Sequence, residues 1–379
     1  MRLFISITIL ILFLSCHNSS TEQISKPKPK QYLVVLGIAQ DGGFPHIGCQ
    51  RDCCTNYYER KVSKQKVVSL GLVDKKAKKK FLFEATPDMT TRLDDLERNH
   101  LKTNKIIEGI FVTHAHMGHY AGLLYFGREA LGKKDIPVYT MPKMMSFLRY
   151  NGPWSQLINL KNIQFPDLKE DSTVVATKSL KITPFLVPHR DEFSETVGFK
   201  IQGEHKSALF IPDINKWELW KKDIIEEVKK VDYAFLDATF FKNGEIDRPM
   251  SEVPHPYIEE TVSLFQNESK ATKNKIIFIH FNHTNPALQP NSKETKDLEV
   301  QGFRVAKEKE VFELLKERYG EKLKQNGRYA TFDFETDDTQ LELKSRRIKS
   351  TTYPTMMLSY HKLKKAQDDL GKKKSIFLF

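Results

Sequence analysis

Three histidines, His114, His116 and His119, lie within the six-residue segment HAHMGH. They follow Ile106–Thr113, an apolar run that predicts a buried strand, and they precede an apolar segment that predicts a helix. Imidazole is the most frequent metal-binding side chain near neutral pH, and spacings of two and three residues on a sharp turn let several rings reach one point. The cluster therefore favours folds that place a metal centre between a strand and a helix.

Other metal-binding and acidic side chains come directly after later predicted strands. Leu180–Val187, Ala208–Ile211, Tyr233–Leu236 and Lys275–Ile279 are followed by His189, Asp213, Asp237 and His280. Residues at the strand ends of α/β sheets converge on one crevice, where such folds bind ligands. We therefore expect these four side chains to meet the histidine cluster.

Short β-rich runs alternate with amphipathic segments, which predicts an α/β layered domain. Thr86-Pro87-Asp88 is typical of a helix start, and this helix should run to about Asn99. A helix over Val305–Tyr319 and an edge strand over Tyr329–Phe334 are also expected. We place one domain at residues 31–335 and a C-terminal extension of unknown role at 336–379.

The first sixteen residues form a secretory signal, because one Arg precedes an apolar run too short to be a stable membrane span. Ser15-Cys16 resembles the lipobox of bacterial lipoproteins, in which the Cys is lipidated; the alternative is an ordinary cleaved signal. Residues 17–30 are expected to be a flexible tether. The prediction is a protein exported to the bacterial periplasm or cell surface and anchored to the membrane through Cys16.

The net charge of +12 comes from lysines spread along the chain, with local runs such as Lys75–Lys80 and Lys372–Lys374. We interpret these runs as solvated turns rather than a nucleic-acid patch, so no specific nucleic-acid partner is expected. Attraction to anionic substrates or membranes stays open.

The histidine pattern resembles the metallo-β-lactamase superfamily, whose signature is HxHxDH followed by a distant His, an Asp and a last His. The resemblance covers roughly residues 32–305 and implies an αββα sandwich, with two mixed β-sheets flanked by helices. It also implies two groups of metal ligands, with Asp213 bridging them. The first group is His114, His116 and His189, and the second is His119 and His280.

Gly118 stands where this family has a metal-binding Asp. The departure leaves three alternatives: two zinc ions, one tight and one weak ion, or a single ion such as iron or manganese. The family's early Asp is replaced by Phe83-Glu84-Ala85-Thr86, where Glu84 can orient a metal ligand through a hydrogen bond.

Local segments narrow the resemblance to the branch that contains coenzyme PQQ synthesis protein B and the ribonuclease Z-like phosphodiesterases. They are GIAQDGGFP from Gly37 to Pro45, EATPD from Glu84 to Asp88, LDATF from Leu236 to Phe240, and HFNHTNP from His280 to Pro286. In ribonuclease Z-like enzymes, the positions of Asp237 and His255 hold a pair that protonates the leaving oxygen. The alternative for Asp237 is a cap on the turn after its strand. Asp41 and Asp88 are interpreted as a turn residue and a first-turn helix acid.

Cys49, Cys53 and Cys54 are an odd set of cysteines in six residues, which cannot all form disulfides within one chain. Relatives in the same branch bind a structural zinc at such a cluster, and His283 is our candidate for the fourth ligand. A disulfide from Cys49 to one neighbour, with a free thiol, is the alternative. Adjacent Cys53 and Cys54 can also restrict binding to one of the two.

The function that the sequence favours is a metal-dependent hydrolase that uses a metal-activated water on a small-molecule substrate. Asp213, Asp237 and His255 are the expected catalytic residues, and phosphodiesters are preferred over lactones and other esters or amides. One alternative is an iron-dependent hydroxylase or oxygenase, as the PQQ branch implies. Another is a non-catalytic ligand-binding lipoprotein.

Overall fold

The computed structural model describes residues 29–289 and 291–314, and four short strands in the remainder of the chain. The chain divides into two compact units, of which one is Pro29–Glu317 and the other combines residues 1–28 with 318–379. The first unit ends before the predicted domain boundary at residue 335. The predicted signal, Cys16 and nearly all of the tether lie outside the described residues. Within the described part of the chain, no helix has the length and apolar character needed to span a bilayer.

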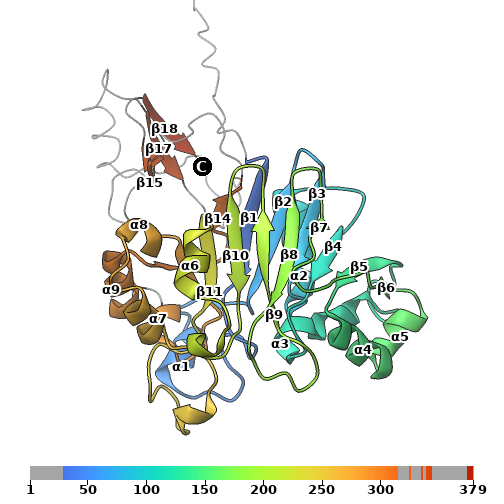
Figure 1. The fold of residues 1–379 in the computed structure, drawn as a ribbon, viewed down its shortest axis with the longest axis horizontal. Helices are drawn as coiled ribbons and strands as arrows, with labels where there is room; N and C mark the ends of the chain where they lie inside the picture. Colours follow the sequence, from blue (N-terminus) through green and yellow to red (C-terminus); the bar gives the residue numbers. More distant parts are fainter. Residues whose placement is uncertain are drawn as a thin grey trace, which may run out of the picture. The chain divides into compact units, whose positions relative to one another are not determined.

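Two mixed seven-stranded sheets form the centre of the first unit (Figure 1). The first sheet has the order β14 (Val311–Glu313), β1 (Gln31–Gly37), β2 (Ser69–Asp74), β3 (Lys79–Phe83), β4 (Gly109–Phe111), β5 (Ile136–Tyr139) and β6 (Ile163–Gln164). The second has the order β13 (Arg304–Val305), β12 (Ile276–Ile279), β11 (Tyr233–Asp237), β10 (Ser207–Ile211), β9 (Val197–Gln202), β8 (Lys181–Leu186) and β7 (Val174–Val175). Antiparallel hairpins and parallel crossovers occur in both sheets.

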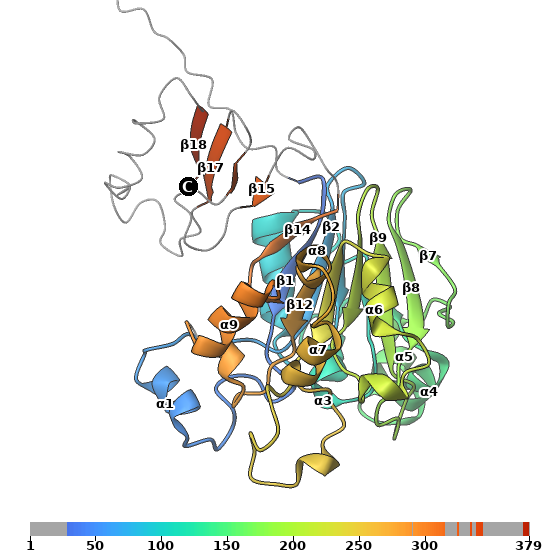
Figure 2. The ribbon, with the colours of Figure 1, turned by 60° about the vertical axis from the view of Figure 1, so that its left-hand side comes forward.

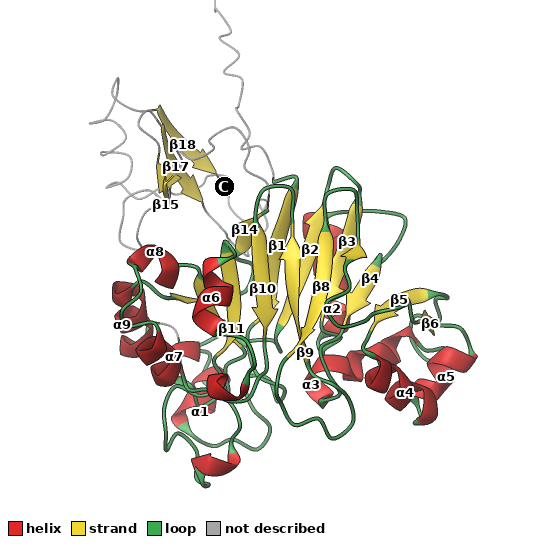
Figure 3. Ribbon diagram, viewed as in Figure 1, coloured by secondary structure: helices red, strands yellow, loops and turns green. Residues whose placement is uncertain are grey.

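Most helices pack outside the paired sheets, whereas α1 and α3 lie near one end of the strands (Figure 3). The helices are α1 (Asp52–Tyr58), α2 (Met89–Asp95), α3 (Met117–Tyr120), α4 (Pro142–Tyr150), α5 (Trp154–Asn159), α6 (Ile224–Lys229), α7 (Ile258–Leu264), α8 (Lys270–Lys273) and α9 (Lys293–Gln301). The predicted helix after Thr86 continues past α2 as a π-helical turn, Leu96–His100. The four layers of helix, sheet, sheet and helix confirm the predicted αββα sandwich of two mixed β-sheets.

Strand β1 shows why the sheets are stacked, because all seven of its residues are buried. Leu33 and Val35 belong to the core cluster that fills the space between the sheets. Tyr32, Val34 and Leu36 point the other way, into the cluster that includes residues of α2. A strand that is apolar on both faces must lie between two layers. Aromatic rings join the sheets, with ring centroids 5.5 Å apart for Phe83 and Phe199 and 5.6 Å apart for Phe111 and Phe199.

The predicted helix over Val305–Tyr319 is wrong in its described part. Val311, Phe312 and Glu313 form β14, which pairs antiparallel with β1. Pairing with the exposed edge of β1 and burial of Phe312 outweigh the helical propensity of the segment. Most of the predicted strand Tyr329–Phe334 lies outside the described residues.

The lysine run Lys75–Lys80 is only partly the solvated turn that was expected. Lys76 and Lys78 are exposed in the β2–β3 turn. Lys80 is buried, where its Nζ donates to Leu101 O at 2.8 Å and forms an ion pair with Glu97. The run therefore ends in a core-packing residue.

In the second unit, four short strands form a sheet in the order β15 (Lys324–Gln325), β16 (Phe334–Glu335), β17 (Thr339–Leu343) and β18 (Lys374–Leu378). Strands β17 and β18 are parallel. The predicted C-terminal extension contains two of these strands.

Candidate metal centre

The predicted site residues converge at one end of the stacked sheets, near α1 and α3 in the lower part of Figures 1 and 2. All but His119 come from a strand end or from the turn after it. His114 and His116 follow β4, His119 lies on α3, His189 follows β8, Asp213 follows β10, Asp237 ends β11, and His280 follows β12.

One group of metal-binding atoms comes from His114, His116, His189 and Asp213, and these atoms lie within 4.8 Å of one another. Asp213 Oδ2 is 3.3 Å from His114 Nε2, and Asp213 Oδ1 is 3.2 Å from His189 Nε2. Thr113 Oγ1 contacts His114 Nδ1 at 2.8 Å, and Asn215 Oδ1 contacts His189 Nδ1 at 3.2 Å. Partners on Nδ1 leave Nε2 of both rings directed at the group, as in protein metal sites.

A second group consists of His119, His280 and Asp41. Asp41 Oδ1 is 3.0 Å from His119 Nε2 and 3.5 Å from His280 Nε2. Glu84 Oε2 lies 3.5 Å from His119 Nδ1, and Thr239 Oγ1 lies 2.9 Å from His280 Nδ1. Glu84 therefore lies beside the ring of His119, at an ion-pair distance rather than in the hydrogen bond that the sequence indicated.

Asp213 lies between the two groups, because its Oδ2 is also 3.8 Å from His119 Nε2. Burial alone would raise the pKa of Asp213, but the charges of His189 and His255 outweigh burial and hold that pKa well below its usual range. A fully buried carboxylate is thus ionised and surrounded by imidazoles. This is the position expected of a ligand shared by two ions.

Metal ions would satisfy the buried polar atoms of this site better than hydrogen bonds among its own side chains do. Several buried polar atoms in the described site have no hydrogen-bond partner although imidazoles and carboxylates surround them; they are Asp41 Oδ1, His119 Nδ1 and Nε2, His189 Nε2, Asp213 Oδ1 and His280 Nε2. Buried polar atoms rarely stay unsatisfied. These are carboxylate oxygens and imidazole nitrogens, the ligand atoms that bind Zn²⁺, Fe²⁺ or Mn²⁺ in proteins. The two groups form a binuclear-type His/Asp metal site.

His255 and Asp237 form a buried pair beside this site. Asp237 Oδ2 is 2.9 Å from His255 Nδ1, and Asp213 Oδ1 is 3.1 Å from the same nitrogen. Burial would lower the pKa of His255, but Asp237 and Asp213 raise it to about 10. Asp237 also accepts hydrogen bonds from the backbone amides of Ile214 and Thr239 at 3.1 and 2.9 Å. It therefore both caps the strand-end turn and fixes His255.

Two non-glycine residues of the site have left-handed backbone, with φ of +71° at Glu84 and +69° at His280. Such conformations are disfavoured for residues with a Cβ and concentrate at functional sites. Both residues stand at a strand end, where the turn aims the side chain into the site.

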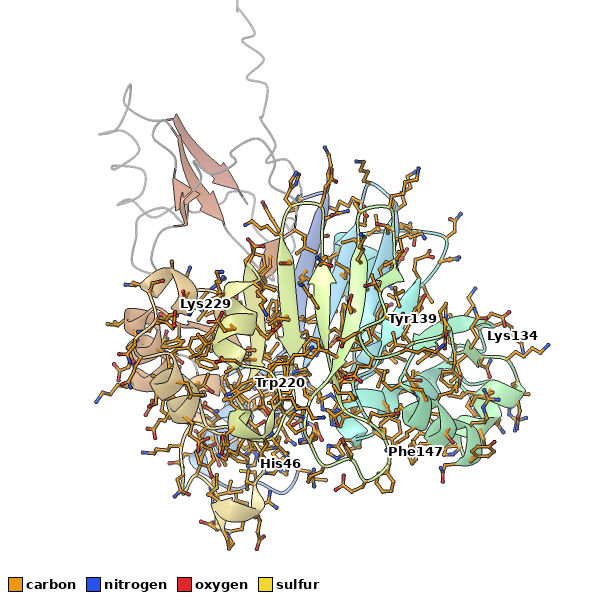
Figure 4. All side chains as sticks on the ribbon, viewed as in Figure 1. His46, Lys134, Tyr139, Phe147, Trp220 and Lys229 are labelled. Carbon is orange, nitrogen blue, oxygen red and sulfur yellow. The ribbon has the colours of Figure 1, made fainter. Side chains whose placement is uncertain are left out.

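The structure brings Cys49, Cys53, Cys54 and His283 together, with one potential ligand atom from each within 4.8 Å of the others. The described cysteines are unpaired, and Cys49 Sγ lies 3.8 Å from Cys53 Sγ. His46, labelled in Figure 4, stacks on His283 with ring centroids 4.3 Å apart. Burial and the neighbouring His46 lower the pKa of His283 to about 4, so its imidazole is neutral at pH 7. Three sulfurs and one neutral imidazole match a tetrahedral zinc site.

A pocket of about 330 Å³ opens beside the binuclear-type site. Its lining includes His255, His283, Arg190 and Arg248. Two arginines and one acid, Glu252, share this lining with His255, so the balance of permanent charges is positive and suits an anionic ligand.

The interpretation of Asp41 as only a turn residue is wrong, because its carboxylate reaches both His119 and His280. The signal in the sequence was the glycine at position 118 together with an acid shortly after β1. Asp88 is not the first-turn acid that was predicted, because it precedes α2 and its side chain makes no capping hydrogen bond; its Oδ2 instead accepts from Val67 N at 3.0 Å.

An αββα sandwich with a binuclear-type His/Asp site at the strand ends defines the class of metallo-β-lactamase folds. The chain belongs to the metallo-β-lactamase superfamily, because the family model described as "Beta-lactamase superfamily domain" matches residues 79–281, more than half of the chain.

Relatives and solved structures extend this assignment. Coenzyme PQQ synthesis protein B of Gluconobacter oxydans is 25% identical over 305 residues, which cover 74% of this chain and 98% of that protein. Zinc-bound PqqB from Methylobacterium extorquens has a TM-score of 0.62 at 20% identity and covers 74% of this chain and 99% of that one. A diphosphatase of the PhnP family has a TM-score of 0.51 at 20% identity and covers 74% of this chain and 96% of that one. The fold is thus shared with PQQ synthesis protein B.

Proposed function

We propose that this chain is a metal-dependent hydrolase that cleaves phosphodiesters or related phosphate esters. The observation that carries the proposal is the Asp237–His255 pair, held 2.9 Å apart and directly beside the binuclear-type site. A metal cluster alone serves many chemistries, whereas a carboxylate-fixed imidazole at its edge suits proton delivery to a leaving oxygen.

Two groups of residues would hold the ions: His114, His116 and His189 for one, and His119 and His280 for the other, with Asp213 between them. Zinc is our choice for both and for the cysteine site, and iron or manganese is the alternative at the His/Asp site. When bound, such ions lower the pKa of a water nucleophile and polarise the phosphoryl oxygen.

The chain's own groups supply orientation and proton transfer. Asp237 accepts from His255 Nδ1, which leaves Nε2 as the nitrogen that donates a proton to the leaving oxygen. His255 lines the pocket together with Arg190 and Arg248. The two arginines would bind the substrate phosphate through charge-assisted hydrogen bonds. One protein of similar fold is named a diphosphatase, in line with this choice.

The test is an assay of the zinc-loaded protein against a phosphodiester, a lactone and a β-lactam. We expect turnover of the phosphodiester, and loss of both metal and turnover in the double variant His114→Ala/His116→Ala. His205→Ala, which removes an exposed histidine, is the matched control. Full activity of the metal-free double variant would refute the proposal.

A second candidate function is an iron-dependent hydroxylase or oxygenase, supported by the similarity to PQQ synthesis protein B over nearly the whole of that relative. Iron as the metal in protein purified from cells, with substrate-dependent oxygen consumption, would favour it over hydrolysis. Binding of a small molecule without turnover would instead indicate a ligand-binding lipoprotein.

We also propose that the protein is exported to the periplasm or cell surface and anchored through Cys16. The apolar run before Ser15-Cys16 and the polar segment after it support this placement.

A further inference from the structure

Gly118 leaves a space that another acid of this chain fills. A Cβ atom added to Gly118 would lie 2.5 Å from Asp41 Oδ1 and 2.6 Å from Asp41 Cα. Real Cβ contacts essentially never fall under 3.0 Å. Any larger residue at position 118 would therefore displace the Asp41 segment. The Asp41 carboxylate stands where a side chain from position 118 would begin.

The contacts of Asp41 are those of a metal ligand. Its Oδ1 faces two imidazole nitrogens, His119 Nε2 at 3.0 Å and His280 Nε2 at 3.5 Å. Among the described residues, none of these three buried atoms has a hydrogen-bond partner. A simple ion pair would engage one imidazole, whereas two imidazoles around one carboxylate oxygen suit a shared cation.

The backbone fixes Asp41 beside His280. Gln40 N donates to Phe281 O at 2.8 Å, and Phe281 N donates to Ile38 O at 2.8 Å. Gly43 N donates to Gln40 O at 2.7 Å and Gly43 has φ of +68°, a conformation that favours glycine. The segment after β1 is thus tied to the residue that follows His280, so the two side chains keep their spacing.

We propose that Asp41 is a ligand of the second metal ion, together with His119, His280 and Asp213, and that it replaces the aspartate absent at position 118. The ligand has moved from α3 to the loop after β1, while the number of carboxylates around the ion is kept. The inference rests on the binuclear-type site of the proposed function and not on the reaction. The experiment that tests the inference measures metal content. The inference can therefore fail while the proposed hydrolase function is upheld.

Metal content tests the proposal. Full-length wild-type protein, Asp41→Ala and the control Asp52→Ala, which removes an exposed acid of α1, are equilibrated with zinc at one buffered free concentration. Bound zinc is then measured by mass spectrometry of the metal. We expect Asp41→Ala to bind one equivalent less than wild type and Asp52→Ala to match wild type. Full zinc content in Asp41→Ala would overturn the proposal.

An isosteric substitution separates ligation from support of the loop. In Asp41→Asn the amide keeps the size of the side chain and removes its charge, so the loop keeps its packing while the carboxylate ligand is lost. Unchanged zinc affinity in Asp41→Asn overturns the proposal, and weakened affinity supports it.

In cobalt-loaded protein, the thiolate-to-cobalt absorption reports the cysteine site separately. An unchanged band in Asp41→Ala would place the lost equivalent at the His/Asp site, as we expect. Loss of that band with full cobalt at the His/Asp site would overturn the proposal.

Discussion

His255 touches two buried carboxylates, and its neighbours raise the pKa of its imidazole to about 10 despite burial. A protonated imidazole that lines the pocket is suited to donate a proton, so His255→Gln should slow the hydrolysis of a phenyl phosphodiester by about 10²–10⁴-fold. A nitrophenyl phosphodiester should be affected far less, because its leaving group needs no proton. The ratio of kcat for the two substrates measures the effect.

The exposed histidine variant His205→Gln serves as the control for this experiment. Zinc content of His255→Gln should equal that of wild type, which separates proton donation from metal binding. An equal loss of rate on both substrates would rule out a role as proton donor.

At the scale of residues, the sequence predicted which side chains meet but not all of their partners. His189, Asp213 and His280 were placed correctly because each follows a strand, and strand ends share one edge. Asp41 was missed because an acid before Gly42-Gly43 is equally typical of an ordinary turn. Only the three-dimensional approach of Asp41 to Gly118 distinguishes the two interpretations.

The 3-10 helix that follows α3, Ala121–Phe126, docks on the loop after β3 through Gly122. Gly122 N donates to Ala85 O at 2.8 Å, and Ala85 N donates to His119 O at 2.8 Å. A Cβ at Gly122 would lie 2.1 Å from Thr86 O, so Gly122→Ala should destabilise the domain by about 1–3 kcal/mol in urea unfolding. It should also weaken zinc binding, because His119 shifts relative to Glu84.

Gly152→Ala is the control for Gly122→Ala, since no described atom lies within 4 Å of a Cβ at Gly152. Its free energy of unfolding should stay within about 0.5 kcal/mol of wild type. Equal free energies of unfolding for the two variants would show that the contact between Gly122 and the loop after β3 tolerates a Cβ atom.

The cysteine cluster joins the loop after β1, which carries Cys49, to α1, which carries Cys53 and Cys54. Cys53→Ser should remove one zinc equivalent and lower the Tm, because a hydroxyl replaces a thiolate ligand. Metal analysis and thermal unfolding measure the two effects, with Ser63→Ala as a control outside the cluster. Unchanged zinc in Cys53→Ser would mean that adjacent Cys54 suffices for the site.

At the scale of elements, strands were predicted better than the last helix. The core strands carry continuous apolar runs that only a buried strand or helix explains, and their short length decides for strands. Val305–Tyr319 has the composition of a helix, yet the open edge of β1 recruits Val311–Glu313 as β14. Such pairing depends on a partner more than 270 residues away in the chain, which local composition does not encode.

At the scale of the molecule, the proposed lipid anchor at Cys16 predicts where the protein should be found. Cys16 is the acceptor of the predicted lipid, so the wild-type protein expressed in bacteria should sediment with membranes. Cys16→Ser should release the protein into the soluble fraction without changing zinc content. Western blots of fractionated cells would measure the distribution. Strong membrane association of both proteins would indicate another anchor, and a soluble wild-type protein would indicate an ordinary cleaved signal.

Metal removal should weaken the whole domain, because the site buries Asp213 and Asp237 among five buried imidazoles, those of His114, His119, His189, His255 and His280. An ion that binds only the folded state stabilises it by about 2.7 kcal/mol when free metal is 100 times Kd. Addition of a chelator should therefore lower the Tm by roughly 5–10 °C. In His114→Ala/His116→Ala the shift should shrink to the part that the cysteine site contributes. If the chelator moved the Tm of wild type and of this variant equally, the histidine cluster would not bind metal in the folded protein, and the hydrolase proposal would fail with it.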